Sequence, residues 1–132
     1  MSEDNSLEDL REQKKQELVE NESSAGAPSE PIHVNGQAEL DDAVDQYDVV
    51  LADFYADWCG PCKMLEPIVE SLAAETDAAV AKVDVDANQA LAQQFGVQGV
   101  PTLVLFADGQ KAEQMVGVQQ KDALAQTIAQ YS

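Results

Sequence analysis

The chain has 132 residues, of which 45% are hydrophobic, and its 25 acidic and seven basic residues give a formal net charge of -18 at pH 7. This length suits one domain of about 100 residues with a short extension. The negative charge excludes electrostatic binding of nucleic acid, which requires a basic face. No apolar run approaches the ~20 residues of a membrane span, and residues 1–10 lack the apolar stretch of a secretory signal. We therefore expect a cytoplasmic location and no membrane partner.

The acidic excess is spread along the whole chain. Residues 1–30 hold nine acidic and three basic residues, and residues 31–132 hold 16 and four. Such a chain repels itself at low salt. The composition predicts a protein from a halophile with high internal salt, although an ordinary acidic protein is the alternative.

Residues 1–30 differ in composition from the remainder of the chain. Ser6, with Asp9 three residues later, can cap a short helix. Residues 23–29, Ser-Ser-Ala-Gly-Ala-Pro-Ser, are typical of a flexible linker. We expect residues 1–30 to form a mobile acidic extension and residues 31–132 to form the domain.

From residue 31 the apolar pattern alternates between strand and helix. Strands are predicted at residues 31–34, 49–56, 79–85, 102–106 and 111–116, and helices at 37–46, directly after the cysteines, at 88–95 and at 121–131. The strand at 49–56 is apolar on both faces, as a central strand covered on both sides should be. Asp108-Gly109 indicates a hairpin between the last two strands. This order predicts an α/β layer fold with an antiparallel pair.

The helix after the cysteines has an apolar side and an internal proline. Pro67 is expected to kink it. The residues expected on its inner side are Met64, Leu65, Ile68, Val69 and Leu72.

Cys59 and Cys62 are the only cysteines of the sequence, and they stand where a helix begins directly after a strand. In a helix this spacing separates Cβ atoms by ~5–6 Å, which is close to disulfide geometry. The helix N-terminus stabilises negative charge. Cys59 should therefore be substantially thiolate at neutral pH and act as the nucleophile, whereas Cys62 should be the resolving thiol.

Two other interpretations of the cysteine pair are open. A zinc site needs two further ligands, but the single histidine, His33, lies 26 residues upstream of Cys59. An inert buried pair is disfavoured by the strand-to-helix position and by the intervening Gly60-Pro61, because proline fits the first turn of a helix. Redox chemistry without a metal is the preferred interpretation.

The segment from Leu51 to Met64, centred on Trp58-Cys59-Gly60-Pro61-Cys62, resembles the active-site segment of thioredoxins almost residue for residue. The resemblance continues through Pro67, residues 83–86 (Val-Asp-Val-Asp), residues 95–102 (Phe-Gly-Val-Gln-Gly-Val-Pro-Thr) and the turn at 106–109. It covers Pro31 to Ser132 and implies a thioredoxin fold, with a central five-stranded mixed β-sheet flanked by four helices.

The resemblance also implies a monomeric protein-disulfide reductase. Cys59 would attack a disulfide of a protein substrate, and Cys62 would then attack Cys59 and release the reduced substrate. Reducing equivalents would come from NADPH or a similar donor through a separate thioredoxin reductase, so that no cofactor is bound. The alternatives are an oxidase or isomerase of the same fold and a non-catalytic binding subunit.

Two charged residues are expected to support the cysteines. Asp53 lies in the most hydrophobic strand, where burial raises a carboxyl pKa, and this makes it a credible proton acceptor for Cys62; the resemblance assigns the same role. Lys82 matches the family lysine that approaches this aspartate and would modulate it. The alternatives are a structural aspartate with a satisfied hydrogen bond and a plain surface lysine.

The resemblance further implies a substrate groove beside the cysteines. Pro101 matches a family proline in the cis form, although most X–Pro bonds are trans, and the backbone of Val100 would pair with an extended substrate strand. The groove residues are Trp58, Gly60, Pro61, Gly99, Val100, Pro101 and Gly117. Two positions depart from the family pattern: Tyr55 replaces a common tryptophan and Glu66 a common alanine, and both are expected to tune the choice of partner.

Overall fold

The computed structural model describes residues 26–132, so the helix and the first linker residues expected within residues 1–25 lie outside the described part. The described elements, in chain order, are β1 (Ile32–His33), α2 (Gln37–Gln46), β2 (Val49–Tyr55), α3 (Gly60–Glu75), β3 (Ala79–Asp84), α4 (Gln89–Gln94), β4 (Thr102–Ala107), β5 (Gln110–Val116) and α5 (Lys121–Tyr131). They agree with the predicted order of strands and helices. Within residues 26–132, no helix is long and apolar enough to cross a membrane.

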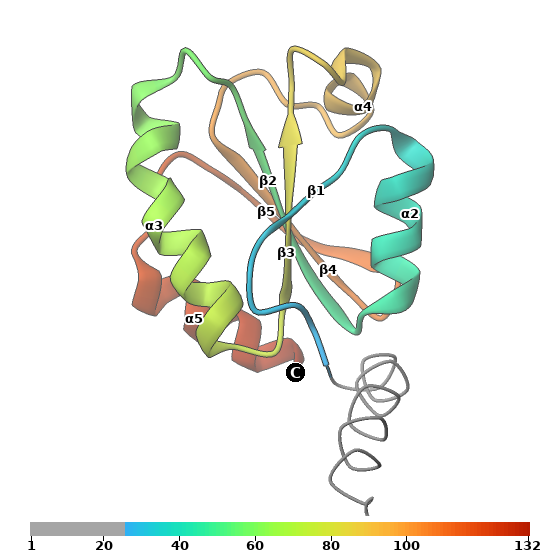
Figure 1. Cartoon of the computed structure of the whole chain (residues 1–132), viewed down its shortest axis with the longest axis vertical. Helices are drawn as coiled ribbons and strands as arrows, with labels where there is room; N and C mark the ends of the chain where they lie inside the picture. Colours follow the sequence, from blue (N-terminus) through green and yellow to red (C-terminus); the bar gives the residue numbers. More distant parts are fainter. Residues whose placement is uncertain (1–25) are drawn as a thin grey trace, which may run out of the picture.

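The five strands form one mixed sheet with the order β1-β3-β2-β4-β5. The strands β1, β3 and β2 run parallel to one another, while β4 is antiparallel to both β2 and β5. Helices α3 and α5 cover one face of the sheet and α2 covers the other (Figure 1). The predicted five-stranded mixed sheet with four helices is therefore confirmed for residues 26–132, and β2 is its central strand.

The face of the sheet toward α2 and α4 carries one of the two large apolar clusters. Alternate residues of a strand point to opposite faces, so every second residue of β2 contributes to it. Its members include Leu40 and Val44 of α2, Leu91 of α4, and Val50, Ala52 and Phe54 of β2.

The opposite face packs against α3 and α5 through the other residues of β2. The second cluster includes Leu65, Val69 and Leu72 of α3, Leu124 and Ile128 of α5, and Val49 and Leu51 of β2. Asp53 follows Val49 and Leu51 in this alternation. The polar side chain is therefore directed to the same face as α3, the helix that begins at the cysteines.

One expectation for α3 was wrong. Met64 is 66% exposed, whereas Leu65 and Val69 are buried and Ile68 packs at the margin of the second cluster. Successive helical residues are separated by ~100° around the axis, and Met64 lies on the outer side of the stripe that begins at Leu65. Pro67 lies inside the helix, which extends without interruption from Gly60 to Glu75.

The predicted hairpin joins β4 and β5. Asp108 and Gly109 have φ values of 51° and 84°, and Ala107 pairs with Gln110 across the turn. Two central residues with positive φ are typical of a type I′ turn, whose twist matches that of the flanking strands. The Asp-Gly signal was therefore correct.

Contact with the domain begins before residue 31. Ala27, in the described part of the expected linker, packs against the cluster between the sheet and α2. Ser29 and Glu30 line a cavity of about 440 Å³ together with residues of β1, β3 and α3.

Candidate active site

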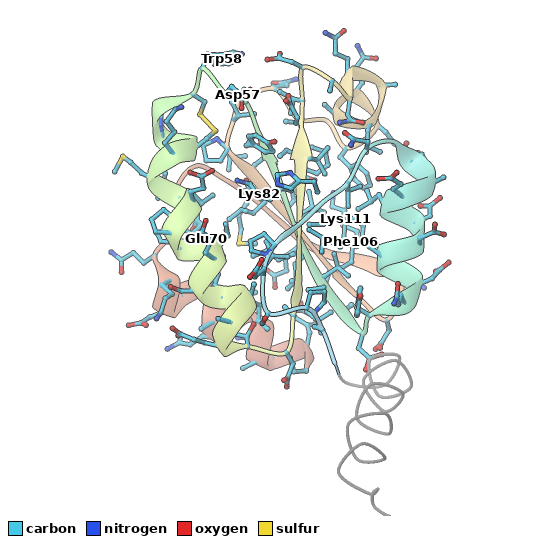
Figure 2. The ribbon with its side chains drawn as sticks, viewed as in Figure 1. Asp57, Trp58, Glu70, Lys82, Phe106 and Lys111 are labelled. Atoms are coloured by element: carbon cyan, nitrogen blue, oxygen red, sulfur yellow. A yellow bond between two sulfur atoms is a disulfide. The ribbon has the colours of Figure 1, made fainter. Side chains whose placement is uncertain are left out.

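The two cysteines occupy the junction between β2 and α3. Cys59 is the N-cap of α3, Pro61 lies in its first turn and Cys62 follows. The two residues form a disulfide with a Cα–Cα distance of 5.3 Å. Figure 2 shows this disulfide at the start of α3, beside Trp58 at the tip of the preceding loop. Each cysteine is at most 5% exposed.

The start of α3 offers a hydrogen-bond donor to the first sulfur. The backbone N–H of Cys62 donates to Sγ of Cys59 at 3.1 Å, and the first turn of the helix contains no acidic residue. After reduction, this N–H and the helix dipole would stabilise negative charge on the Cys59 sulfur. The two cysteines therefore differ in their surroundings, since the backbone N–H of Cys62 points to the sulfur of Cys59.

A loop before β4 lies against the same sulfur. The Val100–Pro101 peptide bond is cis, and the carbonyl oxygen of Val100 lies 3.6 Å from Sγ of Cys59. Gly117 donates its N–H to the carbonyl of Pro101 at 2.8 Å, and its φ of 93° favours glycine. Thr102 Oγ1 donates to the carbonyl of Gly99 at 2.6 Å. The structure therefore brings Gly99, Val100, Pro101 and Gly117 together beside the cysteines.

Trp58 presents an apolar surface next to the disulfide. Its side chain is 71% exposed, and its indole N–H donates to Oδ2 of Asp86 at 2.9 Å. Asp86 lies in the 83–86 segment on which the resemblance was based, but no sequence pattern predicted this contact. The hydrogen bond to Asp86 holds the N–H edge of the indole ring. The backbone of Trp58 holds the other end of the side chain in the β2–α3 loop.

Asp53 is buried in the central strand β2. Its side chain is 1% exposed, and Oδ1 has no hydrogen-bond partner among residues 26–132. Burial raises its pKa from the ordinary 3.8 to about 6, with Lys82 opposing and Glu66 adding to the rise. The alternative of a structural aspartate with a satisfied hydrogen bond has no support at Oδ1.

Lys82 lies opposite Asp53 in the pairing of β2 and β3. It is 7% exposed, so the alternative of a plain surface lysine is wrong. Its Nζ lies 3.2 Å from Oε2 of Glu66 and 4.5 Å from the centre of the Tyr55 ring. The two residues that depart from the family pattern, Tyr55 and Glu66, thus contact the same ammonium group. The signal for Glu66 was its position one helical turn after Cys62.

Among residues 26–132, no group of three or more His, Cys, Asp or Glu side chains could hold a metal ion. His33, the one histidine considered for a zinc site, lies exposed in β1 at the edge of the sheet.

The described site combines a cysteine pair bridged at the start of a helix with a cis-proline loop beside it on a mixed sheet. This combination defines the class of dithiol–disulfide oxidoreductases with this fold. Comparison with known proteins identifies the particular family. The family model "Thioredoxin" matches residues 31–130, and the chain belongs to the thioredoxin family. Its members are thiol–disulfide oxidoreductases that need no bound cofactor, and the chain is a protein-disulfide reductase.

Individual relatives agree with this assignment. The chain is 50% identical to the thioredoxin of Chlamydia muridarum over 84 residues, which are 63% of this chain and 82% of the relative. It is 44% identical to the thioredoxin of Mycobacterium tuberculosis over 103 residues, 76% of this chain and 89% of the relative. A solved N21Q mutant thioredoxin from Halobacterium salinarum is 67% identical, with a TM-score of 0.78 and coverage of 80% of this chain and 93% of that one. This last similarity supports the halophile prediction.

Proposed function

We propose that Cys59 is the nucleophile, Cys62 the resolving thiol and Asp53 the proton acceptor of the reductase reaction. The thiolate of Cys59 attacks one sulfur of a protein disulfide, and the second substrate sulfur leaves as a thiolate. Cys62 then loses its proton to Asp53 and attacks Sγ of Cys59. The mixed disulfide breaks, the first substrate sulfur leaves with its electron pair, and Cys59 and Cys62 are oxidised to a disulfide.

The hydrogen bond from the N–H of Cys62 to Sγ of Cys59 carries this assignment. Through this hydrogen bond, the backbone N–H stabilises negative charge on the sulfur of Cys59 and not on that of Cys62. Asp53 supports it, because a carboxyl with a pKa of about 6 exchanges protons near neutral pH more effectively than one at its ordinary value.

The substrate would bind along the loop that contains the cis-proline. An extended substrate segment would pair with the backbone of Val100, while Trp58 and the Gly60-Pro61 turn flank the disulfide. Gly99, Pro101 and Gly117 would form the remainder of the groove, where the absence of large side chains at the two glycines permits close approach. Lys82 would modulate Asp53 from the opposite strand.

The wider setting of the reaction follows the family. A separate thioredoxin reductase would reload the dithiol with electrons from NADPH or a similar donor, and the chain would act as a monomer in the cytoplasm. Residues 1–30 would form an extension to the catalytic domain at residues 31–132.

Two cysteine variants test the assignment. Cys59→Ser should abolish insulin reduction with dithiothreitol and form no mixed disulfide, because it lacks the attacking thiolate. Cys62→Ser should also lose turnover but should accumulate a mixed disulfide through Cys59, visible on a non-reducing gel and by mass spectrometry. Accumulation with Cys59→Ser in place of Cys62→Ser would reverse the roles, and full turnover by either variant would contradict the mechanism.

A further inference from the structure

Four side chains form a charged cluster between the sheet and α3, which we call the Lys82 cluster: Asp53 and Tyr55 of β2, Glu66 of α3 and Lys82 of β3. The cluster lies on the face of the sheet that α3 covers, and α3 is the helix that begins at the cysteines. Its outer side opens to the cavity lined by Glu66, Glu70 and Lys82. Asp53, at the inner side, is screened from solvent.

The ammonium group of Lys82 has two direct contacts in this cluster. Glu66 holds it at 3.2 Å, and the Tyr55 ring faces it at 4.5 Å. Lys82 also lies opposite Asp53 in the sheet, but no hydrogen bond joins the two side chains in the described part of the chain, where Oδ1 of Asp53 is unpaired. Lys82, which lies opposite the buried carboxyl of Asp53, is therefore bound to the carboxylate of Glu66.

The charged and titratable groups around Asp53 come from the neighbouring strands and from α3. They are Glu66 and the Cys59–Cys62 pair of α3, Lys82 and Asp84 of β3, Tyr55 of β2, and His33 of β1, which lies opposite Lys82. On the β4 side the residue opposite Asp53 is the apolar Leu103. Of these groups, Lys82 lowers and Glu66 raises the pKa of Asp53, in addition to the effect of burial.

We propose that Glu66 is a positioning residue that sets the proton affinity of Asp53, by holding Lys82 away from it and by adding a second negative charge. This inference rests on the proposed role of Asp53 as the proton acceptor. During release of the mixed disulfide, the proton of Cys62 moves to Asp53 as the Cys62 sulfur attacks Sγ of Cys59. Glu66 touches neither sulfur, and it acts on this step only through Lys82 and Asp53. It thereby sets the pH range in which the step proceeds.

The substitution Glu66→Gln tests the proposal because it removes the charge and keeps the shape of the side chain. Glu70→Gln is the matched control: it removes the same charge from the same helix and the same cavity, one turn further from the cysteines. In the oxidised full-length protein, where no thiol titrates, the carboxyl carbon of Asp53 is followed by NMR in a sample with carbon-13-labelled aspartate. Glu66→Gln should move its titration to lower pH by ~0.5 unit, and Glu70→Gln by less than half as much.

The kinetic consequence is measured with the reduced protein and the chromogenic disulfide dithiobis-nitrobenzoate. Attack by Cys59 releases one aromatic thiolate, and resolution by Cys62 releases the second. At about pH 5, well below the pKa of Asp53, Glu66→Gln should accelerate the second release by about two- to threefold, because a pKa lowered by ~0.5 unit leaves a correspondingly larger fraction of Asp53 ionised. In an Asp53→Asn background, Glu66→Gln should have no such effect.

Each result decides a separate point. An unmoved Asp53 titration, or an equal displacement by Glu70→Gln, would overturn the role of Glu66. A titration of Asp53 that Glu66→Gln displaces would support the coupling of Glu66 to Asp53. If Asp53→Asn nevertheless leaves the rate of the second release unchanged, the role of Asp53 as proton acceptor would be overturned.

Discussion

Asp53 is an ionisable side chain in an otherwise apolar stretch of the central strand, and its burial links the mechanism to stability. In the unfolded chain it ionises near its ordinary 3.8, while in the folded protein its pKa is about 6. Between about pH 4 and pH 6 the native state therefore binds more protons than the unfolded state, and the free energy of unfolding falls as the pH rises through this window. The difference between the two pKa values corresponds to roughly 3 kcal/mol.

Asp53→Asn should therefore stabilise the oxidised protein in a pH-dependent manner. At pH 8 we expect the free energy of unfolding to rise by about 2–3 kcal/mol, because the native protein no longer holds a buried charge. At pH 4, where native Asp53 is protonated, the change should be small. Urea unfolding at the two pH values measures this difference, with Asp48→Asn, an exposed aspartate immediately before β2, as the control. An equal effect of Asp53→Asn at both pH values would contradict the linkage.

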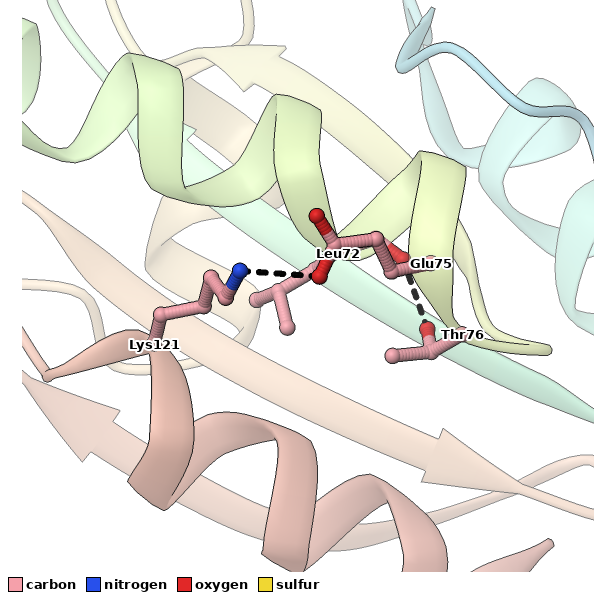
Figure 3. Close-up of polar contacts among 4 residues, drawn as sticks. All are labelled: Leu72, Glu75, Thr76 and Lys121. Atoms are coloured by element: carbon pink, nitrogen blue, oxygen red, sulfur yellow. Dashed lines mark hydrogen bonds and ion pairs between the residues drawn. The ribbon is translucent and has the colours of Figure 1, made fainter.

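At the scale of elements, the contact between α3 and α5 combines an apolar and an ionic component. Leu124 of α5 is 1% exposed and packs in the cluster below α3. At the surface, Nζ of Lys121 lies 2.8 Å from Oε1 of Glu75, and Thr76 Oγ1 donates to the carbonyl of Leu72 at the end of α3 (Figure 3). Exposed ion pairs contribute little to stability, so the apolar component should hold α5 in place.

Two substitutions on α5 separate these components. Leu124→Ala should lower the free energy of unfolding by about 2–5 kcal/mol, through lost apolar burial and the cavity that remains. Lys121→Gln should leave the urea midpoint nearly unchanged, and its small effect should vanish at high salt. A larger loss for Lys121→Gln than for Leu124→Ala would show that the ion pair is the main attachment.

At the scale of the whole molecule, the dominant property is the net charge of -18. Helix α2 illustrates it: Glu39, Asp41, Asp42 and Asp45 lie exposed on one short helix that contains no lysine or arginine. Like charges this close repel one another unless salt screens them. Folding brings these groups nearer than they are in the unfolded chain, so the repulsion acts against the native state.

The melting temperature should therefore rise with KCl between about 0.1 M and about 3 M, as the Debye length falls from ~10 Å to below ~3 Å. The triple variant Asp41→Asn, Asp42→Asn and Asp45→Asn should show a shallower rise, because it carries fewer mutually repelling charges. Differential scanning calorimetry of the full-length oxidised protein measures both slopes. A melting temperature that is flat or falls with salt would contradict the halophile interpretation and leave the family assignment unaffected.

The local features of this protein were accessible from the sequence. Apolar periodicity predicted the strands and helices, because the spacing of apolar residues along the chain indicates whether one face or both faces of an element are buried. The Asp108-Gly109 turn and the entry of α3 at Cys59 depend on the backbone preferences of a few neighbouring residues. The candidate site could be named from the same kind of information, since Cys59 and Cys62 are one helical turn apart and the remaining residues followed from the resemblance.

The tertiary structure decided what depends on residues far apart in the chain. The strand order β1-β3-β2-β4-β5 places Lys82 opposite Asp53, 29 positions earlier, and the docking of α3 brings Glu66 to Lys82. The exposure of Met64 and the contact of Ala27 with the core also depend on residues far apart in the chain. Periodicity specifies which face of an element is apolar, but the environment of each charged group depends on which elements pack together. Burial and the Lys82 contacts, which determine the acidity of Asp53, are therefore properties of the folded molecule.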